Sequence, residues 1–263
     1  MMNVFKREIK AGIKSFLVWT ISVSAFISVC VFMFPQMEGK MDSVSDIFAS
    51  MGAFSSAFGM DRLGLGSLIG FYSVECGTIM ALGATLYAAM VGSQMVGKEE
   101  KGRTAEFLFS MPIKREKVMV EKYFALTILM VAFHIICFGV SLLSIILIKE
   151  EIPMEELLLL HTSYLVITLF IATICFSFST INSMSNIGTG MGLVLFFYFF
   201  NIMANITEKA DWMKYLTPFS FTDGADIVLD KKLDMKYISI WLVISLLSLI
   251  YGFWNYGRRD LKS

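Results

Sequence analysis

The sequence predicts an all-α membrane protein with six transmembrane helices. Of its 263 residues, 56% are hydrophobic and 17% are charged, below the roughly 25% of a soluble domain. Its mean hydropathy is +0.69. A helix needs about 20 residues to cross a hydrocarbon core of about 30 Å, and several continuously apolar runs are that long. The strands of a membrane β-barrel would instead alternate apolar and polar residues. The predicted spans are residues 15–34, 71–96, 124–148, 157–181, 187–206 and 237–256.

Six spans place both termini on one side of the membrane, and the basic residues predict which side. The N-terminal segment, the loop 97–122 and the C-terminal tail hold 14 Lys and Arg residues, against 8 in the loops of the other side. Basic loops face the cytoplasm, so we expect both termini there and the long loops 35–66 and 207–236 outside. The first span is too long for a signal peptide and has no cleavage site before Pro35, so we expect it to be retained.

The segment before the first span has helical amphipathic spacing. Apolar residues recur every three or four positions while Lys and Arg fill the other face, which predicts a helix lying on the inner membrane surface. The apolar positions are Phe5, Ile9, Ile13 and Phe16.

The second span presents one face of small residues. Such faces let membrane helices approach closely, either inside one subunit or between subunits. The small residues are Gly77, Ala81, Ala84, Ala88 and Gly92.

The loop between the second and third spans is the only long, strongly charged run. Its charge is interrupted by the apolar residues Phe107, Leu108, Phe109 and Met111, and Pro112 then ends any helix that precedes it. Apolar residues exposed in such a loop predict a docking surface for a partner.

The sequence offers no catalytic constellation. Residues 92–99 match G-x-x-x-x-G-K, but Glu99 stands where a phosphate-binding loop needs Ser or Thr, and the segment ends a membrane helix instead of following a strand. The net charge of zero gives no electrostatic case for nucleic acid binding. The four cysteines show no C-x-x-C spacing and are interpreted as small hydrophobic residues, with no metal site.

Two ionisable residues of the spans are candidates for a translocation path, because charge is costly in lipid. Glu75 falls at the outer interface when the second span is anchored at its cytoplasmic end, so a solvated or hydrogen-bonded glutamate is the alternative. His134 lies deeper in the third span, where an interhelical hydrogen bond is the alternative.

The pattern E-x-x-x-T-A-E-F-L-x-S-x-P-I-x-R at 100–115 resembles the cytoplasmic loop of ABC-2 type transporter permeases. FKREIKAGIKSFLVW at 5–19 resembles the N-terminal elbow helix of this family, and YLTPFSFTDGADIV at 215–228 resembles its segment before the last span. Many relatives read E-x-G-T, whereas Arg103 separates Gly102 from Thr104 here. The resemblance covers nearly the whole chain, residues 1–263, as a single transmembrane domain.

The resemblance implies a non-enzymatic permease subunit in the cytoplasmic membrane of a bacterium. It would dimerise or pair with a similar permease and carry two ATP-binding subunits, which would hold the ATP and Mg while this chain binds no cofactor. A coupling helix between spans two and three would contact the partner, with Thr104 capping it and Glu106 favouring its positive end. The residues assigned to this contact are Glu99, Glu100, Gly102, Arg103, Thr104, Glu106, Phe107, Leu108, Met111 and Pro112.

The expected activity is ATP-driven export, with a peptide antibiotic or another amphipathic compound as one kind of cargo. A non-transporting sensor or immunity protein is the alternative, which a neighbouring gene for an ATPase would argue against. A third hypothesis, a membrane-embedded enzyme, has no support, because the sequence offers neither a paired acid and base nor a set of metal ligands.

The charge bias yields a topology test with single cysteines in a chain stripped of native cysteine. An impermeant maleimide should label positions 40, 149 and 232 in intact cells, and it should not label positions 101, 114 and 259. Labelling of Lys114→Cys in intact cells would overturn the orientation.

Overall fold

The computed structural model describes residues 4–37, 52–60, 62–63, 66–102, 114–181, 186–206 and 208–258. It confirms the predicted fold class, because six helices are long and apolar enough to cross a membrane and the described residues contain no strand. These helices are α1 (Val4–Met37), α4 (Leu68–Gln94), α7 (Arg115–Ile148), α8 (Met154–Ile181), α9 (Ile187–Ile206) and α11 (Met235–Arg258).

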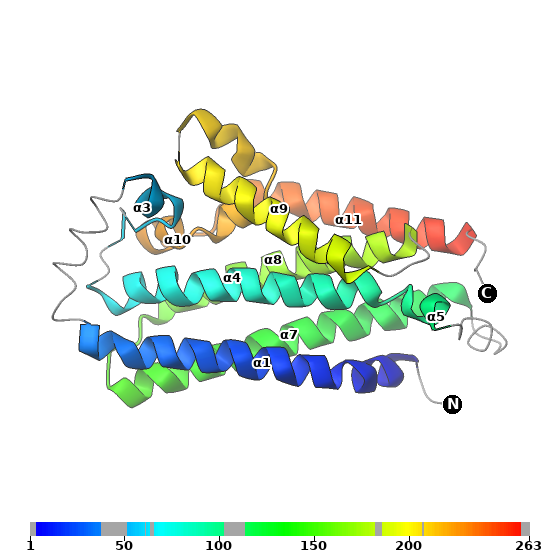
Figure 1. Cartoon of the computed structure of the whole chain (residues 1–263), viewed down its shortest axis with the longest axis horizontal. Coiled ribbons are helices and arrows are strands. Elements are labelled where there is room, and N and C mark those ends of the chain that lie inside the picture. The colour runs from blue at the N-terminus through cyan, green and yellow to red at the C-terminus, as the bar shows by residue number, and fades with distance from the viewer. Residues whose placement is uncertain are drawn as a thin grey trace.

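The six helices lie roughly lengthwise in one bundle, as Figure 1 shows. The start of α1 and the end of α11 lie at the same end, which we call the termini end. The short helix α5 (Lys98–Lys101) also lies there, whereas α3 (Ala53–Ala57) and α10 (Gly224–Asp230) lie at the opposite end. The predicted loop 207–236 holds α10 and two 3-10 helices, η2 (Glu208–Tyr215) and η3 (Pro218–Thr222).

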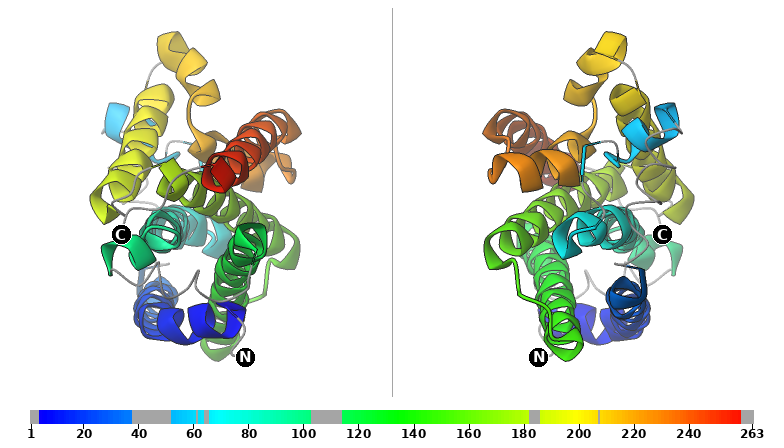
Figure 2. Two further views of the ribbon diagram at one scale, coloured as in Figure 1. Left: turned by 90° about the vertical axis from the view of Figure 1, so that its right-hand side faces the viewer. Right: turned by 90° about the vertical axis from the view of Figure 1, so that its left-hand side faces the viewer.

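Viewed end-on, the bundle has three tiers (Figure 2). The central tier is α4 with α8, which make the most extensive contact in the chain. On one side α1 packs along α7, and on the other side α9 contacts α4 while α11 contacts α8. The central helices are accordingly the most buried spans, and α9 and α11 the least.

Helix α1 combines the amphipathic N-terminal segment and the first span in one unbroken helix of 34 residues. A separate elbow helix is therefore not seen among the described residues. The end-on views nonetheless show the first turns of α1 leading off crosswise from the rest of the helix (Figure 2). Contact of these turns with the membrane surface stays a prediction.

Local sequence explains where several helices begin and end. The Ser67 side chain accepts a hydrogen bond from Gly70 N at 3.2 Å and caps α4. Helix α7 ends at Ile148, and the next residue, Lys149, has a left-handed φ of 63°. At 34 residues α7 is about 50 Å long, more than a hydrocarbon core of about 30 Å, so its charged first turns extend beyond the apolar span.

The small face of α4 packs against α8 inside the subunit, which decides between the two alternatives for that face. All five of its small residues are buried. A Cβ at Gly92 would lie 2.9 Å from the Ala172 carbonyl oxygen, and one at Gly77 would lie 2.4 Å from the Tyr164 hydroxyl. A methyl group at Gly92 would require the backbone of α8 to move, and one at Gly77 would require the Tyr164 side chain to move.

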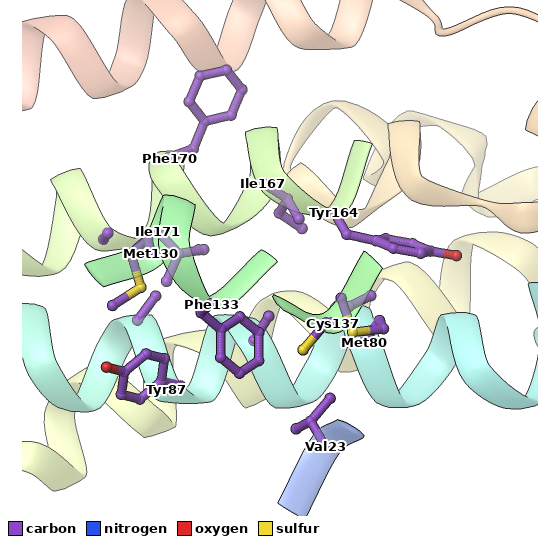
Figure 3. Close-up of a cluster of buried hydrophobic side chains, with 14 of the residues drawn as sticks. Val23, Met80, Tyr87, Met130, Phe133, Cys137, Tyr164, Ile167, Phe170 and Ile171 are labelled. Carbon is purple, nitrogen blue, oxygen red and sulfur yellow. The ribbon is translucent and has the colours of Figure 1, made fainter. Parts of the chain in front are cut away.

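Large side chains from four helices fill the space around this contact (Figure 3). The rings of Phe133 of α7 and Tyr87 of α4 are tilted toward each other with centroids 5.5 Å apart, and Val23 of α1 is buried in the same cluster. The outer faces are apolar and exposed, as in Leu147, Leu247 and Ile250, which suits contact with lipid. All four cysteines are buried free thiols, consistent with their interpretation as small hydrophobic residues.

We predict that Gly92→Ala destabilises the chain by about 1–3 kcal/mol, because the added methyl group meets the backbone of α8. Thermal unfolding in detergent measures the effect. The control is Gly139→Ala on α7, where nothing lies within 4 Å of the new methyl group, so stability should be unchanged or higher. Equal unfolding temperatures for the Gly92→Ala protein and the unsubstituted chain would contradict the close contact.

Candidate functional site

Three of the residues assigned to the coupling contact, Glu99, Glu100 and Gly102, lie at the termini end. Helix α5 contains Glu99 and Glu100 and is followed by Gly102, while α7 begins at Arg115. Helix α5 and the first turns of α7 therefore lie at the same end of the bundle (Figure 1). The other assigned residues lie outside the described ones, namely Arg103, Thr104, Glu106, Phe107, Leu108, Met111 and Pro112.

Lys122 is the centre of a buried set of charges beside this segment. Its side chain is 1% exposed. The ammonium group donates to Glu99 Oε1 at 2.6 Å and to the Met95 carbonyl oxygen at 2.6 Å. Glu8 Oε1 of α1 lies 3.4 Å from the same nitrogen. The buried ammonium group of Lys122 thus has two carboxylates and one carbonyl as partners. A buried charge needs such partners, because it has lost its contact with water.

Two further cations complete the set. Arg7 Nη2 lies 2.7 Å from Glu99 Oε1 and 3.1 Å from Glu8 Oε1. Lys98 pairs with Glu8, whose side chain is fully buried. We call these five residues, Arg7, Glu8, Lys98, Glu99 and Lys122, the Lys122 cluster. It contains three positive and two negative charges from α1, α5 and α7.

Neighbouring contacts support the Lys122 cluster. The Phe5 backbone N–H donates to Glu121 Oε2 at 3.0 Å, which joins the first turn of α1 to α7. The Phe5 and Phe124 rings have centroids 5.5 Å apart. Because Glu121 and Lys122 are adjacent on α7, the hydrogen bond from Phe5 joins α1 to α7 directly beside the cluster.

Sequence reasoning missed Glu8 and Lys122. The amphipathic pattern of the first segment draws attention to its apolar and basic residues and gives no role to Glu8. Lys122 enters the sequence analysis only as one of the basic residues that predict the orientation. The available signal was the single carboxylate of Glu8 within a basic stretch, because opposite charges near helix ends often pair. Lys98, the lysine of the G-x-x-x-x-G-K match, forms an ion pair with Glu8. The match follows the helix α4, whereas a phosphate-binding loop follows a strand.

The Lys122 cluster is suited to holding α1, α5 and α7 together and not to catalysis. Its charged groups are paired with one another, and Lys122 and Glu8 are inaccessible to solvent. Within the described part of the chain, no group of three His, Cys, Asp or Glu could hold a metal ion.

Glu75 and His134 occupy different environments. Glu75 is exposed in the second turn of α4 at the opposite end, beside Phe54 and Phe58. His134 is buried, and its Nε2 lies 2.9 Å from Thr168 Oγ1 of α8. The interhelical hydrogen bond named as the alternative for His134 is therefore present, while a path role for either residue stays a prediction.

The opposite end carries a second polar contact set. Arg62 Nη2 lies 3.1 Å from Asp223 Oδ2, and Arg62 also pairs with Asp226. Asn205 of α9 donates to Asp223 Oδ2 at 3.2 Å, and Asp223 caps α10 through the Ala225 backbone N–H at 2.9 Å. Burial raises the pKa of the Asp223 carboxyl, as does the nearby Asp226, while the Arg62 guanidinium opposes the increase.

The sequence was compared with known families and proteins. Residues 2–261 match the family described as ABC-2 family transporter protein. The chain belongs to this family. A search of curated proteins finds no match to it. Membership agrees with six membrane helices, and it makes the chain a multi-pass permease subunit of an ABC transporter, which associates with an ABC ATP-binding subunit.

The Lys122 cluster yields a stability test. Glu8→Ala and Glu99→Ala each leave Lys122 one carboxylate, whereas the double variant leaves it none. We expect the double variant to lose roughly 0.5–3 kcal/mol more unfolding free energy than the two single losses combined. Chemical unfolding in micelles, followed by tryptophan fluorescence, measures this coupling.

Adding Lys122→Met to the double variant removes the stranded charge and should recover much of the loss. Glu116→Ala, an exposed carboxylate on the same helix, is the control and should change stability by less than about 0.5 kcal/mol. Simple additivity of Glu8→Ala and Glu99→Ala would contradict the arrangement around Lys122.

Proposed function

We propose that the chain is the permease subunit of an ATP-driven ABC-2 type exporter. It couples ATP hydrolysis by a separate subunit to movement of a substrate across the membrane. The observation that carries this proposal is the Lys122 cluster, which anchors both ends of the segment 98–122 to the bundle at the termini end. A segment that receives force from a partner needs such an anchor.

We call residues 98–111 the coupling segment. The coupling helix proper is proposed at residues 105–111 of this segment, with Thr104 as its N-terminal cap and Glu106 near its positive end. The apolar residues Phe107, Leu108 and Met111 enter a groove on the ATP-binding subunit, and Pro112 ends the helix. Two copies of that subunit bind a pair of permeases, either two copies of this chain or this chain and a similar one. ATP and Mg bind to the partner.

The termini end faces the cytoplasm of a bacterium in this proposal. The bias of 14 basic residues against 8 supports that orientation. The cargo is an amphipathic compound, for which a peptide antibiotic is one candidate, and resistance to it is the expected phenotype. Glu75, exposed at the outer end of α4, and His134 are the candidate path residues.

Truncating Phe107 tests the coupling helix. Phe107→Ala should weaken partner binding by about 2 kcal/mol or more, roughly a 30-fold loss of affinity, because central aromatics dominate small interfaces. Glu106→Ala changes charge more than contact area, so it should leave assembly intact and separate ATP hydrolysis from transport. Partner stoichiometry after purification, ATPase rate and resistance are measured for each variant.

Phe54→Ala is the matched control, since it truncates a phenylalanine that is exposed at the opposite end. It should leave partner stoichiometry unchanged. The chain purified alone should hydrolyse no ATP. Normal stoichiometry, ATPase rate and resistance in the Phe107→Ala, Glu106→Ala double variant would refute the coupling-helix assignment.

A further inference from the structure

The Lys122 cluster joins three parts of the chain that are far apart in sequence. These are the first turns of α1, the helix α5 that precedes the predicted coupling contact, and the start of α7 that follows it. We propose that the cluster makes these parts one rigid unit, with Lys122 as the positioning residue that carries motion of the coupling segment into α1. This inference rests on the proposed function and adds the route by which motion leaves that segment.

The contacts form a closed triangle. Glu99 of α5 binds Lys122 of α7 at 2.6 Å, and Lys122 lies 3.4 Å from Glu8 of α1. Glu8 returns to α5 through Lys98, and Arg7 adds a contact of 2.7 Å to Glu99. A single ion pair permits rotation about its axis, whereas three helices linked pairwise keep their relative positions. The two ends of the coupling segment and α1 are therefore restrained together.

Burial makes the triangle costly to open. Separating Glu99 from Lys122 would remove the shorter of the two carboxylate contacts of a lysine that is buried from water, and would leave it only Glu8 at 3.4 Å and the Met95 carbonyl. The Met95 carbonyl fixes the ammonium from a third direction, at the point where α4 ends. A displacement imposed at residues 98–112 consequently moves the whole unit.

Helix α1 can carry that movement across the membrane. Its 34 residues extend about 50 Å, and it packs along α7 and against α4. Near its far end the Phe34 and Phe71 rings are 5.6 Å apart, which connects α1 to the first turns of α4. Close-packed interiors absorb little displacement, so a shift at the termini end reaches the opposite end of α4.

Distances between spin labels test the rigid unit. The four native cysteines are replaced by alanine, and labels are attached to cysteines at Lys10 of α1 and Lys117 of α7, both exposed. The full chain is studied in nanodiscs with its co-purifying ATP-binding subunit, without nucleotide and after trapping with ATP and vanadate. The starting chain, with Lys122 and Glu8 present, should give one narrow distance that is the same in both states.

Lys122→Gln and Glu8→Gln each remove one corner of the triangle while nearly keeping side-chain size. Each should broaden the distance distribution or add a second distance, while the partner still binds and hydrolyses ATP. Lys14→Gln, an exposed lysine on α1, is the matched control and should leave the distance narrow. A purely structural loss would instead lower yield and partner binding together.

Narrow, unchanged distances in both Lys122→Gln and Glu8→Gln would overturn the inference. A distance that shifts between the two nucleotide states while the Lys122 cluster is intact would also overturn it. If no ATP-binding subunit co-purifies, the proposed function fails, yet the nucleotide-free comparison still tests the rigid unit. The two failures are therefore distinguishable.

Discussion

The close approach of α4 to α8 determines how the other helices are arranged. Gly77 and Gly92 allow it, because a methyl group at either position would collide with α8. Lipid tails are as apolar as the helices, so association depends on such van der Waals contact and on interhelical hydrogen bonds. With these two helices in contact, α1 and α7 pack together on one side, while on the other side α9 packs on α4 and α11 packs on α8.

The polar contacts differ in strength along the bundle. Within it, Tyr72 of α4 joins Ser141 of α7 at 2.7 Å and His161 of α8 at 2.8 Å. Interhelical hydrogen bonds of this kind contribute about 0.6 kcal/mol on average. Breaking a buried ion pair by removing one partner costs about 3–5 kcal/mol. The termini end is therefore joined by buried ion pairs, whereas the interior is joined by neutral hydrogen bonds and by the close packing of α4 on α8.

Span positions followed from the sequence because lipid imposes a simple rule. An apolar run of about 20 residues must be helical to satisfy its backbone, and residues 187–206 match α9 at both ends. The ends of α1 and α7 were underestimated, since their charged turns continue as helix beyond the apolar run. The five-residue ion cluster was not predicted. Glu8 and Lys122 are far apart in the chain, and pairing at that distance leaves no periodic signal.

The pairing of the helices could not be predicted from the sequence either. A stripe of small residues identifies a face for close packing, as on α4, but it does not name α8 as the partner. That choice depends on the shapes of Tyr164, Ala172 and Cys175 on the facing helix. The functional assignment depended instead on a short pattern at 100–115, and membership of the family agrees with it.

The pairing of α1 with α7 has a consequence for synthesis in the cell. Phe5 and Glu121, which join these helices, are 116 residues apart in the chain. At about 5–20 residues per second, the ribosome needs on the order of ten seconds to make the second after the first. During that interval Glu8 has no Lys122 to pair with, so the ion pair that links α1 to α7 cannot form. The first helix therefore reaches its final position only after the third has been made.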